Sequence, residues 1–292
     1  MKNFKRFITG FLIVLIVGGF WGCAKLPESK TIQPPTLEPT FPLPTAVPTS
    51  TSIIPAANQT TRIPDEDVVW KILEQVNRDR VLEDLRKITG EAPICDGSDC
   101  FTVTSRPTGS EGLQWVKKYV SAELDRWGYS VAFKDWANAE YSDQNLIAKK
   151  EGSTLPDEVI YFVAHLDGVG DGQGGKYPGA DDDASGVADL LEVARVLRDY
   201  SFERTVIFLF STGEEQGALG VKSYLRQLSS KEMNAIKYVI DIDVIGYDQD
   251  RDGVMQLFHG DHAPSKALTE TIREIMLEYG VNLTPEITKG CG

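Results

Sequence analysis

The stretch Val159–Gly186, VIYFVAHLDGVGDGQGGKYPGADDDASG, decides which fold the sequence predicts. It opens with an apolar, partly β-branched run, Val159–Val163, which is typical of a buried strand in an α/β sheet. His165 follows this run, and Asp167 comes two residues later, so both side chains project to the same side of an extended chain. Open α/β sheets bind their ligands beyond the carboxyl ends of their strands. We therefore expect a ligand site at this point.

Three consecutive aspartates, Asp181, Asp182 and Asp183, follow a glycine-rich loop and precede Ser185 at the start of an amphipathic segment. Carboxylates this dense repel one another unless a cation lies among them, and a metal ion is the simplest such cation. Taken alone, the three aspartates would be interpreted as an N-terminal cap of a helix. The nearby imidazole of His165 favours a metal site.

The composition is that of an ordinary globular protein, with 41% apolar and 25% charged residues in a chain of 292. The net charge of −13 argues against a nucleic-acid partner, because phosphate groups are bound by clustered Lys and Arg and the sequence has no such cluster. The four cysteines, at positions 23, 95, 100 and 291, lack the paired spacing of a structural zinc module.

The N-terminal segment, residues 1–23, has the form of a secretory signal. Three basic residues precede the apolar run Phe7–Trp21, which is short for a membrane span of about 20 residues. The Gly-Cys pair that ends the segment resembles a bacterial lipoprotein signal, so we expect a lipid anchor on Cys23. An uncleaved anchor and a fully secreted product are the alternatives. All three place the protein outside the cytoplasm.

Residues 24–64 are rich in Pro, Thr and Ser without apolar periodicity, so we expect a disordered, extended tether ahead of one folded domain at 65–292. From Asp65 to Ile88 the apolar residues recur at close to helical spacing. Cys95 and Cys100 lie in a turn-rich segment. In an oxidising compartment, a disulfide between them is favoured over two free thiols.

Strands and helices alternate through the rest of the domain. Two short strands are predicted at Tyr129–Phe133 and Asn145–Lys149, and buried strands at Thr205–Phe210 and Ile236–Ile245, with amphipathic helices between and after them. This order predicts an α/β fold with a mostly parallel mixed sheet and helices on both faces.

Candidate ligands stand at the ends of three separate strands. His165 and the aspartate cluster follow the first, Glu214 and Glu215 follow the second, and Asp243 lies in the third. Because the carboxyl ends of parallel strands meet along one edge, these groups can converge. One imidazole with several carboxylates suits two zinc ions that share a carboxylate. Of the two adjacent glutamates, one can bind metal while the other acts as a general base.

Four blocks of sequence resemble, in order, the signature blocks of the co-catalytic di-zinc exopeptidases, a family that includes bacterial leucyl aminopeptidases and glutamate carboxypeptidase. They are AHLD at 164–167, PGADDDASG at 178–186, GEEQGALG at 213–220 and YVIDIDVIGY at 238–247. The resemblance extends from about Asp65 to the C-terminus. It implies the three-layer zinc-exopeptidase sandwich, two zinc ions and peptide substrates.

By position, His165 resembles the histidine ligand of one zinc, and Asp167 the carboxylate that orients this histidine. The bridging ligand would be Asp182, with Asp181 or Asp183 in its place if the register differs by one. A cis peptide bond often follows the bridging aspartate in the family, so the resemblance implies one between Asp182 and Asp183.

In the later blocks, Glu214 resembles the general base that takes a proton from a metal-activated water. Glu215 resembles a ligand of the other zinc, and Asp243 the remaining carboxylate ligand. Asp241 occupies a neighbouring position that is not a ligand in the family.

The family's last ligand is a histidine well downstream of the position of Asp243, followed by a closing strand and helix. The sequence ends at Gly292 without that helix. We therefore expect a chain that is truncated at its C-terminus before this histidine, that would hold a second zinc poorly and that could be inactive as it stands. The rival for this ligand is His262.

Asp248–Gly253 matches the start of a calcium-binding loop, but the twelfth position is His259 where a Glu is required, so we interpret it as a solvated turn. The resemblance favours a zinc-dependent aminopeptidase. Its alternatives are a glutaminyl cyclase-like enzyme and a non-catalytic receptor or binding module on the same fold. A free general base at Glu214 favours catalysis over the binding module.

Overall fold

The computed structural model describes residues 67–170 and 175–290. The predicted signal peptide, the lipidation site Cys23 and the tether lie outside these residues, as does Cys291. Among the described residues, no helix is both long and apolar enough to cross a bilayer.

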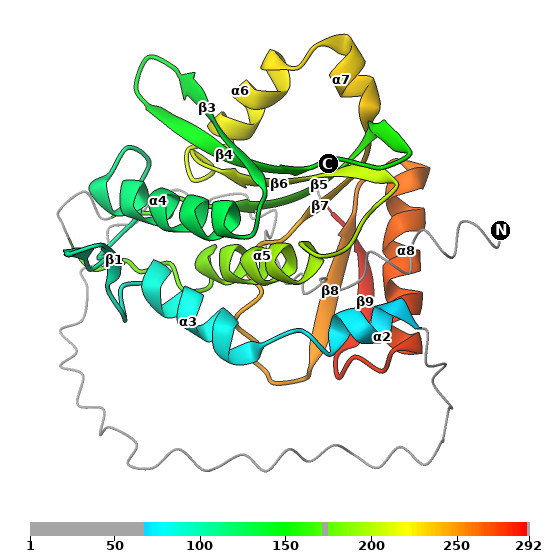
Figure 1. Ribbon diagram of the computed structural model, residues 1–292. Coiled ribbons are helices and arrows are strands. Elements are labelled where there is room, and N and C mark those ends of the chain that lie inside the picture. The colour runs from blue at the N-terminus through cyan, green and yellow to red at the C-terminus, as the bar shows by residue number, and fades with distance from the viewer. Residues whose placement is uncertain (1–66, 171–174, 291–292) are drawn as a thin grey trace, which may run out of the picture. The chain divides into compact units, whose positions relative to one another are not determined.

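A five-stranded sheet lies at the centre of the fold (Figure 1). Its strands are, in spatial order, β3 (Ser130–Ala137), β4 (Ser142–Lys150), β6 (Arg204–Ser211), β5 (Leu155–His165) and β7 (Ile236–Asp241). β5 pairs in parallel with β6 and β7, whereas β4 is antiparallel to both β3 and β6. All strands except β4 therefore run in one direction, which confirms the predicted mostly parallel mixed sheet.

Helices cover both faces of this sheet. Figure 1 shows α4 and α5 on one face and α6 and α7 on the other. Their bounds are α4 Glu111–Arg126, α5 Ala184–Leu197, α6 Leu219–Gln227 and α7 Ser230–Ala235. The predicted three-layer arrangement is confirmed.

The alternation of side chains along the strands divides the core between the two faces. Ile160, Phe162 and Phe208 point into the larger core beneath α4 and α5. Their neighbours Tyr161, Val163 and Ile207 point the other way, into the core beneath α6. Buried on both faces, β5 and β6 read as nearly continuous apolar runs, which is why the sequence revealed them clearly.

The segment from Asp65 to Ile88, with its near-helical spacing, contains two helices, α2 (Val68–Leu73) and α3 (Arg78–Ile88). Asn77 separates them, because its backbone is extended and its side chain accepts hydrogen bonds from the amides of Asp79 and Arg80. An asparagine in this role begins a new helix rather than continuing the previous one.

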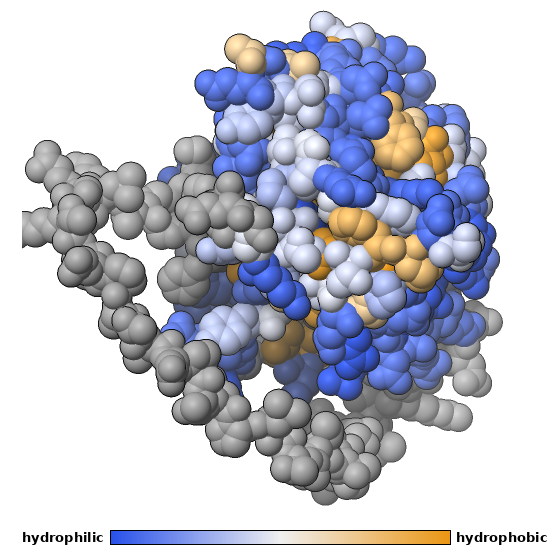
Figure 2. All heavy atoms as spheres, turned by 90° about the vertical axis from the view of Figure 1, so that its left-hand side faces the viewer, coloured by the Kyte–Doolittle hydropathy of each residue, from blue (hydrophilic) through white to orange (hydrophobic). Residues whose placement is uncertain are grey.

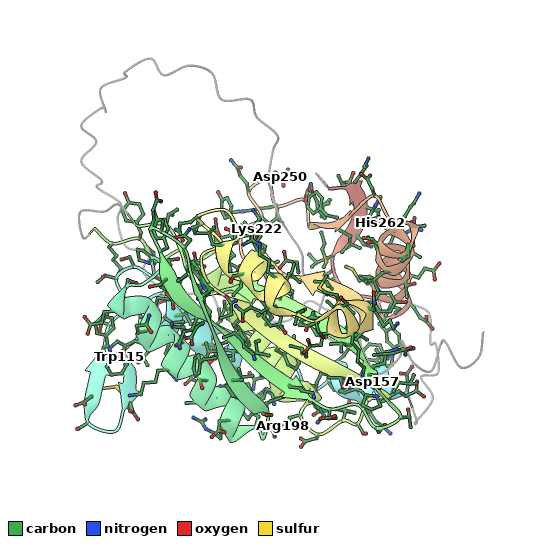
Figure 3. The ribbon with its side chains drawn as sticks, turned by 90° about the horizontal axis from the view of Figure 1, so that it is seen from above. Trp115, Asp157, Arg198, Lys222, Asp250 and His262 are labelled. Carbon is green, nitrogen blue, oxygen red and sulfur yellow. A yellow bond between two sulfur atoms is a disulfide. The ribbon has the colours of Figure 1, made fainter. Side chains whose placement is uncertain are left out.

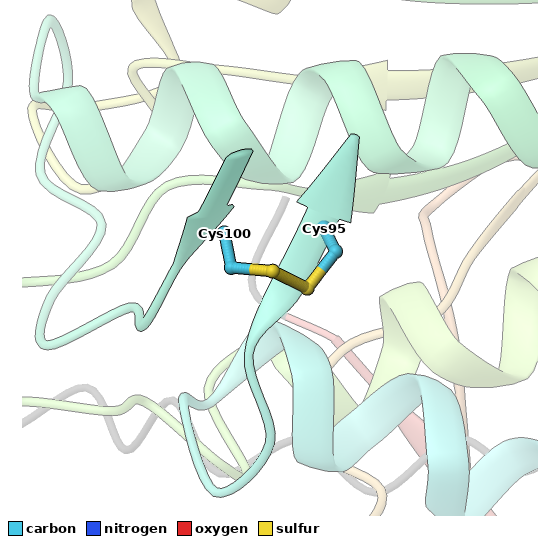
Figure 4. Close-up of a disulfide and its surroundings, with 2 residues drawn as sticks. All are labelled: Cys95 and Cys100. Carbon is cyan, nitrogen blue, oxygen red and sulfur yellow. A yellow bond between two sulfur atoms is a disulfide. The ribbon is translucent and has the colours of Figure 1, made fainter. Parts of the chain in front are cut away.

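A short hairpin follows α3, formed by β1 (Ile94–Asp96) and β2 (Asp99–Phe101). Cys95 and Cys100 face each other across it and form a disulfide (Figure 4). Figure 2 shows the side of the molecule on which this hairpin lies, where hydrophilic side chains predominate and apolar ones form small patches.

The C-terminal part of the described chain forms a second, smaller layer. β8 (Val254–His259) and β9 (Thr284–Lys289) form a parallel pair of their own, and α8 (Ala263–Glu278) connects them. Met255 and Leu257 of β8 pack against Ile272 and Met276 of α8. Figure 1 shows this unit to one side of α5.

Candidate metal centre

The carboxyl ends of β5, β6 and β7 deliver the predicted ligands to one edge of the sheet. His165 is the last residue of β5, Glu214 and Glu215 follow β6, and Asp243 follows β7. The register pairs His165 with Ser211 at the end of β6, which fixes the relative height of the strand ends.

His165, Asp182 and Asp243 form a group whose potential ligand atoms all lie within 4.8 Å of one another. The His165 Nε2 atom lies 3.0 Å from Asp182 Oδ1 and 3.7 Å from Asp243 Oδ1. His165 is buried, whereas the side chain of Asp182 is 50% exposed, so the group opens to solvent on the aspartate side. The structure thus brings together three of the four predicted metal ligands around one point.

The donor set fits a zinc ion. The oxygens Asp243 Oδ1 and Glu215 Oε1 are buried and have no hydrogen-bond partner among the described residues. A buried carboxylate oxygen without a partner is costly, and a bound cation removes that cost. Imidazole nitrogen and carboxylate oxygen are both ordinary zinc ligands.

The hydrogen bonds of Asp181 and Asp183 show which of the three aspartates is left to bind a metal ion. Asp183 accepts hydrogen bonds from the amides of His165 and Gly186, each at 3.0 Å, and so begins α5. Asp181 Oδ1 accepts from the amide of Gly246 at 2.7 Å. Of the three, Asp182 is the one whose carboxylate lies beside the imidazole of His165, with Oδ1 3.0 Å from Nε2. The peptide bond between Asp182 and Asp183 is cis, as the resemblance implied.

Asp167 is fully buried and connects β5 to the loop after β6. Its carboxylate accepts from the amides of Glu214 and Glu215 at 3.2 and 3.3 Å, and Thr108 Oγ1 lies 3.2 Å away. His165 Nδ1 lies 3.0 Å from the backbone carbonyl of Asp167 and 3.8 Å from its carboxylate. Asp167 therefore orients the imidazole through its carbonyl, while its carboxylate holds the two glutamates.

The charges of the centre shift one another's pKa values. Burial, and then the charge of Asp182, raises the pKa of Glu215 to about 7. Burial also raises the pKa of Glu214. A hydrogen bond from His165 lowers the pKa of Asp182. Carboxylates whose pKa values rise in this way are those that a cation would most stabilise in the charged form.

Neither of the other two histidines joins this group. His262 is exposed and stands directly before the first residue of α8, and His259 Nδ1 lies 2.8 Å from the carbonyl of Gly260. A second group of potential ligands, Asp248, Asp250 and Asp252, is exposed. Figure 3 shows Asp250 on the loop before β8 and His262 at α8.

Two residues around the centre carried no signal in the sequence. Arg106, in the loop before α4, is buried against the strand end after His165, and Thr108 donates to Asp167 or to Gln216. Burial of an arginine depends on partners from distant parts of the chain, which a local pattern does not contain.

The family model described as peptidase family M28 matches residues 145–291, which include the strand ends and all the candidate ligands named above. The chain belongs to peptidase family M28. The resemblance read from the four sequence blocks is thereby confirmed.

Individual M28 relatives match over part of their length. A probable zinc metalloprotease of Pyrenophora teres f. teres is 27% identical over 210 residues, which are 66% of this chain and 43% of the relative. A probable leucine aminopeptidase 2 of Aspergillus oryzae is 34% identical over 119 residues, which are 40% of this chain and 23% of the relative. The chain thus spans less than half the length of these curated relatives.

The fold is also similar to that of solved structures. A zinc aminopeptidase from Bacillus subtilis superposes with a TM-score of 0.61 over 74% of this chain and 80% of the other, at 12% identity. At this identity the likeness concerns the fold alone.

Proposed function

We propose that the chain is a zinc-dependent exopeptidase of the aminopeptidase type, with two zinc ions. The observation that carries the proposal is the convergence of His165, Asp182 and Asp243 beside the adjacent pair Glu214 and Glu215. Family membership and the names of the relatives as aminopeptidase and zinc metalloprotease support it.

His165, Asp182 and Asp243 would hold one ion, and Asp182 with Glu215 would contribute to a second. Zinc, when bound, supplies a Lewis acid and lowers the pKa of a water molecule into the neutral range. The free oxygen of Glu215 supports its assignment as a ligand. The expectation that a histidine beyond Gly292 completes the second site stays a prediction.

Glu214 is the proposed general base. The amide of Glu214 donates a hydrogen bond to the carboxylate of Asp167, which fixes the backbone that carries the Glu214 side chain. Burial raises its pKa, which brings it closer to neutral pH, where a base is most effective. A Glu214 Oε atom would take the proton from the attacking water and return it to the leaving amine.

The test is hydrolysis of a panel of aminoacyl anilides by the zinc-loaded chain and, where the gene continues past Gly292, by its extended product. Glu214→Gln should lower kcat by about 100- to 10,000-fold, the usual scale for a general base, and keep its zinc. Glu151→Gln, an exposed glutamate paired with Lys149, is the matched control and should leave kcat unchanged.

Three outcomes would contradict parts of this proposal. Undiminished turnover in Glu214→Gln would remove its role as the base. Cyclisation of an N-terminal glutamine peptide without anilide hydrolysis would favour the glutaminyl cyclase-like alternative. If both the chain and its extended product bind zinc but neither hydrolyses any substrate, a receptor or binding module would be favoured.

We also propose that the protein acts outside the cytoplasm, held to a membrane by a lipid on Cys23 or secreted. The signal-like segment 1–23 supports this location, and so does the Cys95–Cys100 disulfide, since disulfides persist in oxidising compartments. Metabolic labelling with a palmitate analogue should mark the wild type and spare Cys23→Ala. Equal labelling of both would contradict the lipid anchor.

A further inference from the structure

Arg106 has the largest side chain among those that are almost completely buried, and it lies beside the metal centre without contributing a ligand. It is 1% exposed and belongs to the loop between β2 and α4. A buried arginine usually has a carboxylate as its hydrogen-bonding partner. Arg106 instead directs all three of its side-chain nitrogens to backbone carbonyls.

Those carbonyls come from the two segments that carry the ligands. Arg106 Nε donates to the carbonyl of Leu166, the residue between His165 and Asp167, at 3.0 Å. On the other side, Nη2 donates to the carbonyl of Gly179 at 3.1 Å, and Nη1 donates to that of Pro178. One guanidinium therefore links the end of β5 to the loop that leads into Asp182.

The loop is built to approach this guanidinium closely. Gly179 has φ +50°, and a Cβ atom there would lie 2.4 Å from the carbonyl oxygen of Asp182 and 3.1 Å from Arg106 Nη2. Only glycine adopts this conformation without strain and without that clash. The backbone adds a further link, because the amide of Gly168 donates to the carbonyl of Arg106 at 3.1 Å.

The charge of Arg106 also suits this place. It is a fixed cation near Asp167, Asp182, Asp183 and Glu215, and it remains charged at neutral pH because burial lowers its pKa only to about 10. The three hydrogen bonds that it donates go to carbonyls, so they do not use the oxygens of these carboxylates. The guanidinium thus offsets part of their repulsion without taking the place of a metal ion.

We propose that Arg106 is a positioning residue of the metal centre, whose guanidinium fastens the end of β5 to the Pro178–Gly179 loop and so holds His165 and Asp182 ready for one ion. The inference rests on the proposed zinc site. It deepens that proposal by naming the group outside the ligand set that arranges the ligands before the ion arrives.

The test compares Arg106→Lys with Arg80→Lys in the full chain. Arg80 is the control because it is a partly buried arginine, 22% exposed, with Asp84 and Glu123 as partners. In both variants lysine keeps the charge and removes the planar guanidinium. Zinc affinity is measured by competition with a chromophoric chelator, and the stability of the metal-free chain by urea unfolding.

Arg106→Lys should weaken zinc binding by about 10- to 100-fold, the scale found for groups that orient metal ligands, and Arg80→Lys should not change it. Both variants should lower stability. Equal zinc affinity in wild type and Arg106→Lys would overturn the inference. Failure of the wild type to bind zinc would instead overturn the proposed function.

If Arg106→Lys does not fold, a hydrogen-exchange measurement on the wild type tests the inference instead. The Arg106 Nε–H proton, followed by nitrogen-15 NMR, should be protected from solvent exchange in the metal-free chain, because the link is in place before zinc binds. Free exchange that becomes protected only on adding zinc would show that the ion arranges the site, contrary to the inference.

Discussion

Two clusters of buried charge in this molecule are built differently. Between α3 and α4, Arg80 lies 2.8 Å from Glu123 and 3.4 Å from Asp84, and Tyr119 donates a hydrogen bond to Asp84. At the carboxyl edge of the sheet, the carboxylates gather around His165, and the nearby Arg106 gives its hydrogen bonds to carbonyls. The first cluster contains its own cation, bound directly to its carboxylates.

The charged residues between α3 and α4 stabilise the fold, whereas those at the carboxyl edge of the sheet are arranged to bind a ligand. The first cluster supplies its own cation, so its effect appears in stability, although Arg80 Nε and Asp84 Oδ2 have no hydrogen-bond partner among the described residues. A carboxylate cluster whose oxygens are left without partners gains most when a cation enters. Substitutions in the first cluster should therefore change unfolding and spare zinc, whereas those in the second should weaken zinc binding.

Removing the cation of the first cluster should have the largest effect on stability. Arg80→Met leaves Asp84 buried without its cation, whereas Glu123 keeps its pair with Arg126. The free energy of unfolding should fall by about 3 kcal/mol, the low end for a buried pair, because the Arg80 side chain is 22% exposed. Urea unfolding measures this, and zinc affinity should not change. A loss below about 1 kcal/mol would show that the pair contributes no more than a surface one.

The pH dependence of stability should show the contribution of the cluster between α3 and α4. Burial raises the pKa of Asp84 to about 6, above its value in the unfolded chain. The folded state therefore binds this proton more tightly, so the stabilising contribution is fully present below about pH 4 and is lost as the pH rises through 6. Over that window wild type should lose up to about 3 kcal/mol relative to Asp84→Asn. Parallel curves for the two proteins would contradict the assignment.

The smallest effect is expected at the exposed aspartates before β8. Asp250→Asn should change the free energy of unfolding by less than about 0.5 kcal/mol and leave zinc affinity unchanged, because Asp250 is exposed. A clear loss of stability in calcium-containing buffer, absent in chelator, would instead identify a calcium site there.

Much of the fold was visible in the sequence because its central strands are buried on both faces. The runs at Val159–Val163 and Thr205–Phe210 correspond to the interiors of β5 and β6. Near its edges the sheet was harder to delimit. β3 extends to Ala137, beyond the predicted end at Phe133, because the exposed polar residues Lys134 and Asp135 interrupt the apolar pattern while pairing with β4 continues the strand.

The candidate ligands were visible because they follow strands in recognisable blocks, and the structure places His165, Asp182 and Asp243 together. The sequence did not show which contacts the residues next to these ligands make. That Asp181 and Asp183 hold backbone amides, and that Arg106 reaches two distant carbonyl segments, depends on tertiary contacts. Such contacts have no local pattern.

The most direct test of the account is a zinc titration of the metal-free full chain by calorimetry, with Asp182→Asn beside wild type and Asp250→Asn as the control. We predict saturable binding of at least one zinc per chain in wild type and in Asp250→Asn, and at least about 100-fold weaker binding in Asp182→Asn, since one charged ligand is lost. Equal binding in all three proteins, or none in wild type, would contradict the assignment of this edge of the sheet as a metal centre.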